Sequence, residues 1–113
     1  MTGEPERMKR KIGFEQVNDA RRILGLDEYA TLKEIKGAYR QLAARYHPDR
    51  CRDAKLKTCE KKIREINHSK DILLAYCANY RYSFKETDAL RNSFEQEEYE
   101  YLHRFYDGWI AEL

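Results

Sequence analysis

The sequence lacks a long apolar segment, and its longest apolar run, residues 72–78, is far too short to span a bilayer. Residues 1–11 are polar and charged, so no apolar stretch precedes a small-residue cleavage site near the N-terminus. Three cysteines are present, and an odd number cannot pair completely within one chain. The simplest interpretation is a cytoplasmic protein in a reducing compartment, with free thiols at Cys51, Cys59 and Cys77.

Charged residues are what the sequence has in abundance. They make up 37% of the 113 residues, and the mean hydropathy is −0.94, which is typical of a small helical protein with a heavily solvated surface. Aromatic residues at 12% argue against disorder throughout the chain. This length leaves room for one domain with one modest core, but not for a deep catalytic pocket.

The charge is unevenly divided along the chain. Residues 1–85 hold 20 Lys and Arg against 12 Asp and Glu, a net charge of +8. Residues 86–113 hold 2 Arg against 8 acidic residues, a net charge of −6. The overall charge of +2 therefore combines a basic body with an acidic C-terminal segment. An acidic surface argues against binding to a membrane, because membrane-surface helices favour Lys and Arg on their polar face.

Apolar residues recur at three- and four-residue spacing in four segments, which indicates amphipathic helices. We expect an all-α fold with a flexible arm at 1–13 and helices at 14–24, 31–46, 61–80 and 87–113. The second and third helices are similar in length and joined by a loop, so they should pack as an antiparallel hairpin. The first helix should close the open side of this hairpin, and the last helix is additional to it.

Several residues at the expected helix ends match capping patterns. Thr31 and Glu34 fit a capping box at the start of the second helix. Gly25 occupies the place of a C-cap after the first helix. Thr87 or Asp88 is a plausible N-cap for the last helix. These local signals support the expected boundaries.

The second helix has to stop at the tripeptide His47-Pro48-Asp49. Pro48 lacks an amide hydrogen, and its ring disfavours helical geometry at His47, so we expect the helix to end close to Tyr46. A rigid turn that carries an imidazole and a carboxylate then lies at the tip of a positively charged helix. Such a turn is better suited to engaging another protein than to filling a core.

Four blocks of the sequence, in this order, resemble the J domain of DnaJ-type co-chaperones. They are ILGL at 23–26, EIKxAYRxLA at 34–43, YHPDR at 46–50 and IREIN at 63–67. The resemblance covers about residues 17–80 and implies the J-domain helical hairpin. It also implies that the protein binds an ATP-loaded DnaK-type chaperone and stimulates ATP hydrolysis by that partner. The catalytic residues then belong to the partner, and this chain is neither an enzyme nor the holder of a cofactor.

The resemblance also implies which residues bind the partner. By position, these are His47, Pro48, Asp49, Tyr39, Arg40, Lys36, Arg45 and Arg50. Tyr39, Arg40 and Arg45 are expected to be exposed on the helix, with Lys36 beside them. Packing at the edge of the core is an equal alternative for Tyr39 and the favoured one for Tyr46, which follows the apolar stripe. Independently of the family, Lys36 and Arg40 share one stripe of the helix and can steer an acidic partner surface. Asp49 can accept charge-assisted hydrogen bonds from a partner arginine.

The resemblance divides the chain into an arm at 1–13, a J domain at 14–84 and an acidic, aromatic helix at 85–113. That last helix is expected to pack on the J domain or extend it. A Gly/Phe-rich linker and Cys-x-x-Cys-Gly repeats do not occur, so we interpret the chain as a minimal J protein. Family members often carry Asn where this chain has Cys51.

Other functions remain open at this stage. One is a scaffold module that keeps the fold and recruits a specific partner, a client or an assembly partner, through 86–113. The same acidic segment can instead lie across helix 31–46 and limit chaperone access. A nucleic-acid-binding helical domain is a weaker alternative, because the sequence pI of about 8.4 is below that of a strongly basic DNA-binding domain.

A metal site and a hydrolytic site are the last alternatives. The residues that invite a metal interpretation are Cys51, Cys59, Cys77, His47, His68 and His103. The spacing from Cys51 to Cys59 is not a usual zinc spacing, and Cys77 lies on the expected core face of its helix, as does Tyr80. A hydrolase built on His47 and Asp49 would need a nucleophile and an oxyanion site, and the sequence offers neither.

Overall fold

The structure is a computed structural model that describes residues 11–105, and this part of the chain is helical without a strand. The helices are α2 (Phe14–Ile23), α3 (Leu32–Arg45), α4 (Leu56–Asn79), α5 (Glu86–Arg91) and α6 (Gln96–Phe105), with 3-10 turns η1 (Pro48–Arg50) and η2 (Asp53–Lys55). The predicted all-α class is confirmed. Most of the expected arm, and Gly108, Trp109 and Leu113 of the expected last helix, lie outside the described residues.

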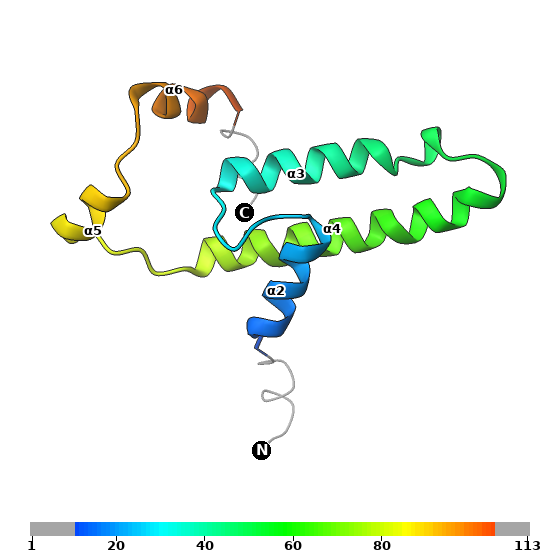
Figure 1. The fold of residues 1–113 in the computed structure, drawn as a ribbon, viewed down its shortest axis with the longest axis horizontal. Coiled ribbons are helices and arrows are strands. Elements are labelled where there is room, and N and C mark those ends of the chain that lie inside the picture. The colour runs from blue at the N-terminus through cyan, green and yellow to red at the C-terminus, as the bar shows by residue number, and fades with distance from the viewer. Residues whose placement is uncertain (1–10, 106–113) are drawn as a thin grey trace, which may run out of the picture. The chain divides into compact units, whose positions relative to one another are not determined.

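α3 and α4 form the predicted antiparallel hairpin, with α2 packed across it (Figure 1). The three helices meet in one core of buried side chains, namely Ala20, Leu24, Ile35, Ile66 and Leu73. Because α2 covers the end of the hairpin where α3 begins and α4 ends, the loop that joins α3 to α4 lies at the other end, away from α2 (Figure 1). This loop carries the tripeptide identified in the sequence.

The end of α2 is set by a Schellman motif, as the position of Gly25 predicts. The amide of Gly25 donates to the carbonyl of Arg22 over 3.0 Å, and the amide of Leu26 donates to the carbonyl of Arg21, also over 3.0 Å. Gly25 has a φ of +71°, which a glycine adopts without the steric penalty of a side chain. The chain therefore turns sharply toward α3.

The start of α3 is fixed by the predicted capping box. Thr31 is the N-cap, and its hydroxyl accepts from the amide of Glu34 over 3.1 Å. The Glu34 carboxylate reaches back and accepts from the amide of Thr31 over 2.7 Å. Two helix amides that would otherwise lack a partner are satisfied by side chains of the same turn.

α4 differs from its predicted bounds at both ends. It begins at Leu56 rather than near residue 61, because η2 leads directly into its first turn. The early turns are exposed except at Cys59, which is 7% exposed, so they carry no apolar period for sequence reasoning to detect. At the other end the helix stops at Asn79, and Tyr80 is 53% exposed instead of lying on a core face.

The chain divides into two compact units, Met1–Cys77 and Ala78–Leu113. In the second unit, the expected single helix from residue 87 is wrong within the described residues, because α5 ends at Arg91 and α6 begins at Gln96. Asn92 ends α5 as its C-cap, and its side-chain amide donates to the carbonyl of Asp88 over 2.9 Å. Such local bonds from Asn compete with helix continuation.

The N-cap expected for this segment is also different. Lys85 occupies the cap position, and its side chain makes no capping hydrogen bond. Thr87 and Asp88 lie inside the first turn of α5 instead. Asp88 pairs with Arg91 over 3.7 Å, which places opposite charges one turn apart on this short helix.

Candidate functional site

The tripeptide forms an exposed turn at the tip of the α3–α4 hairpin. α3 ends at Arg45, and the amide of Tyr46 donates to the carbonyl of Leu42 over 3.0 Å, as expected for a helix that stops at Tyr46. His47 is extended, with φ −61° and ψ +138°, which is the geometry that a following proline favours. Pro48 then begins η1, where its missing amide hydrogen leaves no bond unmade. We refer to residues 47–50 as the HPD loop.

The side chain of His47 stabilises the HPD loop from within. Its Nδ1 atom accepts a hydrogen bond from the amide of Asp49 over 3.1 Å, and Nδ1 lies 3.6 Å from the Asp49 carboxylate oxygen. An imidazole that accepts at Nδ1 carries its proton on Nε2, so Nε2–H remains as a donor. The side chains of His47 and Asp49 are 56% and 90% exposed, so both polar ends are open to a partner.

Three arginines around the HPD loop are exposed, as expected. Arg40 and Arg45 lie on α3, and Arg50 ends η1. The Arg45 guanidinium lies 5.6 Å from the centre of the Tyr46 ring, a distance at which a cation is attracted to the ring face. Tyr46 itself is half-buried and packs against the core, as predicted from the apolar stripe. Exposed positive charge therefore precedes the loop in the sequence, at Arg40 and Arg45, and ends it, at Arg50.

Two other predicted contact residues are not exposed as expected. Lys36 is only 8% exposed, so it does not share an open stripe with Arg40. Tyr39 is half-buried and packs against the core, and its hydroxyl donates to Asn67 Oδ1 over 3.0 Å. The ammonium of Lys70 lies 4.8 Å from the centre of the same ring. Tyr39 thus connects α3 to α4.

Asn67 and Lys70 were not identified from the sequence as partners of Tyr39. Asn67 lies 28 positions further along the chain than Tyr39. A pattern read along one helix carries no information about a partner on another helix. Only the antiparallel register of α3 and α4, which the structure fixes, brings these side chains together.

The cysteines differ from the prediction of three free thiols. Cys51 and Cys59 form a disulfide whose Cα atoms lie 6.4 Å apart, and Cys77 remains a thiol. The prediction assumed that both residues were idle, whereas Cys51 follows the HPD loop and Cys59 faces inward from α4. Partial burial raises the pKa of the Cys77 thiol above its usual range. The cytoplasmic location loses the support of free thiols and stays a prediction.

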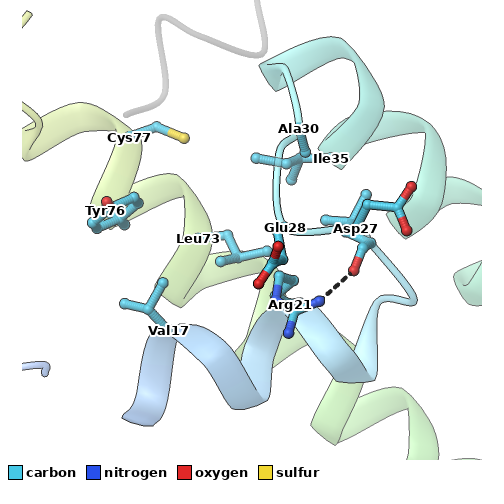
Figure 2. Close-up of a pocket in the computed structure, with 10 residues that line it drawn as sticks. Val17, Arg21, Asp27, Glu28, Ala30, Ile35, Leu73, Tyr76 and Cys77 are labelled. Carbon is cyan, nitrogen blue, oxygen red and sulfur yellow. Dashed lines mark hydrogen bonds between the residues drawn. The ribbon is translucent and has the colours of Figure 1, made fainter. Parts of the chain in front are cut away.

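The first unit contains a small cavity (Figure 2). It has a volume of about 120 Å³ and lies where α2 and the α2–α3 connection meet α4. Its apolar side is formed by Val17, Ile35 and Leu73, and Cys77 lies at its edge. Arg21 donates from Nη1 to the carbonyl of Leu26 over 2.9 Å beside it. The cavity has room for a few water molecules.

No helix between residues 11 and 105 is long and apolar enough to cross a membrane. Over the same range, no three His, Cys, Asp or Glu side chains gather closely enough to hold a metal ion. Of the residues that invited a metal interpretation, Cys51 and Cys59 are joined to each other.

A helical hairpin that exposes a His-Pro-Asp turn at its tip defines the J-domain class of proteins. The model of the DnaJ domain family matches residues 19–78 of this chain. Because this match covers more than half of the 113 residues, the chain belongs to the DnaJ domain family. The predicted family is therefore confirmed.

Curated relatives resemble part of the chain. This chain is 49% identical over 55 residues to the chaperone protein DnaJ of Mycoplasmopsis pulmonis, covering 49% of this chain and 14% of that protein. It is 44% identical over 60 residues to the chaperone protein DnaJ 2 of Synechocystis sp., covering 53% and 19%. With the chaperone protein DnaJ 2 of Aquifex aeolicus, it shares 47% identity over 51 residues, covering 45% and 13%. The matched region thus spans less than a fifth of these relatives. No solved structure matches the chain.

Proposed function

We propose that this chain is a co-chaperone whose J domain binds a DnaK-type chaperone in its ATP state and stimulates ATP hydrolysis through the HPD loop. The observation that carries the proposal is the HPD loop itself. Its imidazole and carboxylate are exposed, held by a proline-initiated turn, and placed away from the core. A turn that is ordered before binding loses little conformational entropy when a partner engages it.

The charges near the HPD loop support a defined mode of docking. Arg40, Arg45 and Arg50 are exposed, two of them before Asp49 in the sequence and one directly after it. Arginines of this kind orient an acidic partner surface and speed its association. Asp49 then accepts a charge-assisted hydrogen bond from the partner, and His47 Nε2 offers a donor. The chain supplies no catalytic group, because the hydrolytic residues lie in the partner.

Tyr39 and Lys36 take a different place in this proposal. Tyr39 is half-buried and Lys36 is buried, so neither offers a large area for direct contact with the partner. Their main contribution is to the shape of the α3 surface. Tyr39 fixes the spacing of α3 and α4 through Asn67. We expect a Tyr39→Phe change to weaken docking much less than loss of Arg40 or Arg45.

A single-turnover ATPase assay with a DnaK-type chaperone tests the proposal. Asp49→Asn removes the charge of the loop while keeping its size, and we expect stimulation to fall at least about 10-fold because a buried charge-assisted bond is lost on docking. Asp53→Asn is the matched control. It makes the same chemical change in the same α3–α4 connection, at an exposed residue outside the HPD loop.

The result that contradicts the proposal is specific. If the wild-type chain does not stimulate the chaperone, or if Asp53→Asn reduces stimulation as much as Asp49→Asn, the HPD loop is not the trigger. His47→Gln gives a second check, because glutamine cannot reproduce the Nδ1 bond to the Asp49 amide in the same geometry.

We propose a second role for the acidic segment 86–113, because apolar side chains are exposed there. Leu90 and Phe94 are 66% and 72% exposed. Aromatic and apolar side chains of this kind serve as anchors when a partner covers them. We expect residues 86–113 to bind a client or assembly partner, and removal of this segment to leave ATPase stimulation intact while abolishing capture of that partner. The cytoplasm, where DnaK-type chaperones act, is the proposed location.

A further inference from the structure

The disulfide joins the end of the HPD loop to α4. Cys51 is the C-cap residue of η1, and its amide donates to the carbonyl of Pro48 over 3.2 Å. Its sulfur is bonded to that of Cys59, which lies 8 positions further along and is buried on α4. The bond thus connects the tripeptide region to a buried residue of α4.

The hydrogen bonds of residues 47–55, all of which the structure describes, are short-range. The amide of Arg50 donates to the carbonyl of His47 over 2.8 Å, and the amide of Lys55 donates to the carbonyl of Arg52 over 3.2 Å. The amide of Asp49 donates to His47 Nδ1. The amide of Leu56, the first residue of α4, donates to the carbonyl of Asp53, but no bond of residues 47–52 reaches α4. The disulfide is therefore the link that holds the end of the HPD loop against the body of this helix.

The ring that the disulfide closes also contains a residue in an unfavourable conformation. Asp53 has a φ of +58°, in the left-handed region that non-glycine residues rarely adopt. Asp tolerates this region better than most residues, yet it gains by leaving it when nothing holds the turn. Opening the disulfide therefore favours a different backbone conformation of residues 51–56. The end of the HPD loop that adjoins Cys51 is then less ordered.

The two sulfurs differ in access. Cys51 is half-buried and lies in the sequence between two exposed cations, Arg50 and Arg52, whereas Cys59 is only 7% exposed. An attacking thiolate therefore reaches Cys51 rather than Cys59. The neighbouring positive charges attract anionic thiols.

We propose that the Cys51–Cys59 disulfide is a reversible thiol–disulfide exchange site that sets the activity of the HPD loop. Its co-reactants are anionic low-molecular-weight thiols and their disulfides. This inference rests on the proposed function in one respect, namely that the HPD loop stimulates a DnaK-type chaperone. The oxidised chain is the more active form, because its loop is ordered before docking.

The exchange is balanced as two successive substitutions at sulfur. A thiolate attacks Cys51 Sγ, a mixed disulfide forms, and the bond to Cys59 breaks, so that Cys59 leaves as a thiolate and takes up a proton. A second thiolate attacks the outer sulfur of the mixed disulfide and releases Cys51 as a thiolate. Two thiols thus supply two electrons and become one small-molecule disulfide, while the protein gains two thiols. The reverse sequence restores the bond.

The first measurement reports the site without the chaperone. The full chain is equilibrated with reduced or oxidised glutathione, and its thiols are counted by maleimide labelling and mass. We expect one labelled thiol, Cys77, under oxidised glutathione and three under reduced glutathione after denaturation. Hydrogen exchange of amides 49–55 should be faster in the reduced chain, with exchange in the middle of α4 unchanged.

The second measurement reports the coupling to function. In the single-turnover ATPase assay, reduction should raise the concentration for half-maximal stimulation about 3- to 10-fold, since docking must then order the loop. Cys51→Ser should behave as the reduced chain under both conditions. Cys77→Ser is the matched control and should keep the full difference between the two conditions. The Cys51→Ser variant also shows that glutathione does not act through the chaperone.

Each outcome decides between the two proposals. Three labelled thiols under oxidised glutathione, or equal stimulation and equal exchange in both states, overturn the exchange site while leaving the co-chaperone function standing. No stimulation in either state, with faster exchange of amides 49–55 on reduction, overturns the co-chaperone function and the coupling to it. A Cys77→Ser chain that loses the response overturns the assignment to the Cys51–Cys59 pair.

Discussion

The two ends of the α3–α4 hairpin are held in different ways. At the end covered by α2, Leu24, Ile35 and Leu73 are at most 5% exposed and are held by packing. At the tip, His47 and Asp49 are exposed, and a proline turn and a disulfide hold the chain. The difference teaches that a domain with one small core need not extend that core to its functional end. Covalent and conformational constraints fix the tip instead.

This division predicts that changes at the core end alter stability, whereas changes at the tip alter activity. Ile66→Ala should have the largest effect on stability, because Ile66 is 2% exposed in the core that the three helices share. We expect the free energy of unfolding to fall by about 2–5 kcal/mol. Urea unfolding followed by circular dichroism measures it. Ile23→Ala, at a residue that is 42% exposed, is the control. Equal losses in the two variants would contradict the assigned core.

Loss of the disulfide should have the second largest effect on stability. Cys51→Ser should lower the free energy of unfolding by about 2–3 kcal/mol, because the unfolded chain loses a constraint on a short loop. Urea unfolding of the wild type with and without reductant should give the same difference. Cys77→Ser should unfold with an unchanged dependence on reductant. If reductant leaves the wild-type midpoint where it is, the tip is not held by the bond.

A smaller effect is expected at the start of α3. Thr31→Ala removes the hydroxyl that accepts from the Glu34 amide and should lower the free energy of unfolding by about 1 kcal/mol. Thr58→Ala makes the same substitution at an exposed position inside α4 and should be neutral or slightly stabilising, because Ala favours helix interiors. Thermal unfolding of the two variants compares them directly, and equal melting temperatures would argue against the capping box.

A substitution in the HPD loop should have the smallest effect on stability. Asp49→Asn should change the free energy of unfolding by less than about 0.5 kcal/mol, since the side chain is 90% exposed and its ion-pair contact is with the exposed His47 of the same loop. The same variant should lose most of the ATPase stimulation. A large loss of stability in the urea experiment would mean that the tip and the core are not separable, and the comparison between the two ends would fail.

Features determined by neighbouring residues were predictable from the sequence. Thr31 and Glu34 lie in one turn, Gly25 directly follows α2, and Pro48 acts on the residue before it, so each boundary follows from local chemistry. The family resemblance located the HPD loop for the same reason, because its residues are contiguous. The fold class and the exposed tip were therefore available before the structure.

Features determined by register were not predictable. Tyr39 meets Asn67 only because α3 and α4 run antiparallel at one particular offset. Cys51 and Cys59 come together because η2 turns the chain back into α4. The spacing of apolar residues in the sequence does not predict this turn. The burial of Lys36 likewise depends on what surrounds α3 in three dimensions. These contacts changed two of the predicted exposed residues into structural ones.

The ring closed by Cys51 and Cys59 has a consequence for proteolysis. Arg52, Lys55 and Lys57 are exposed within this ring, so trypsin should cut there first. A chain cut inside a covalent ring stays in one piece. On a gel without reductant, the nicked protein would therefore migrate as intact, and only reductant would release its two fragments.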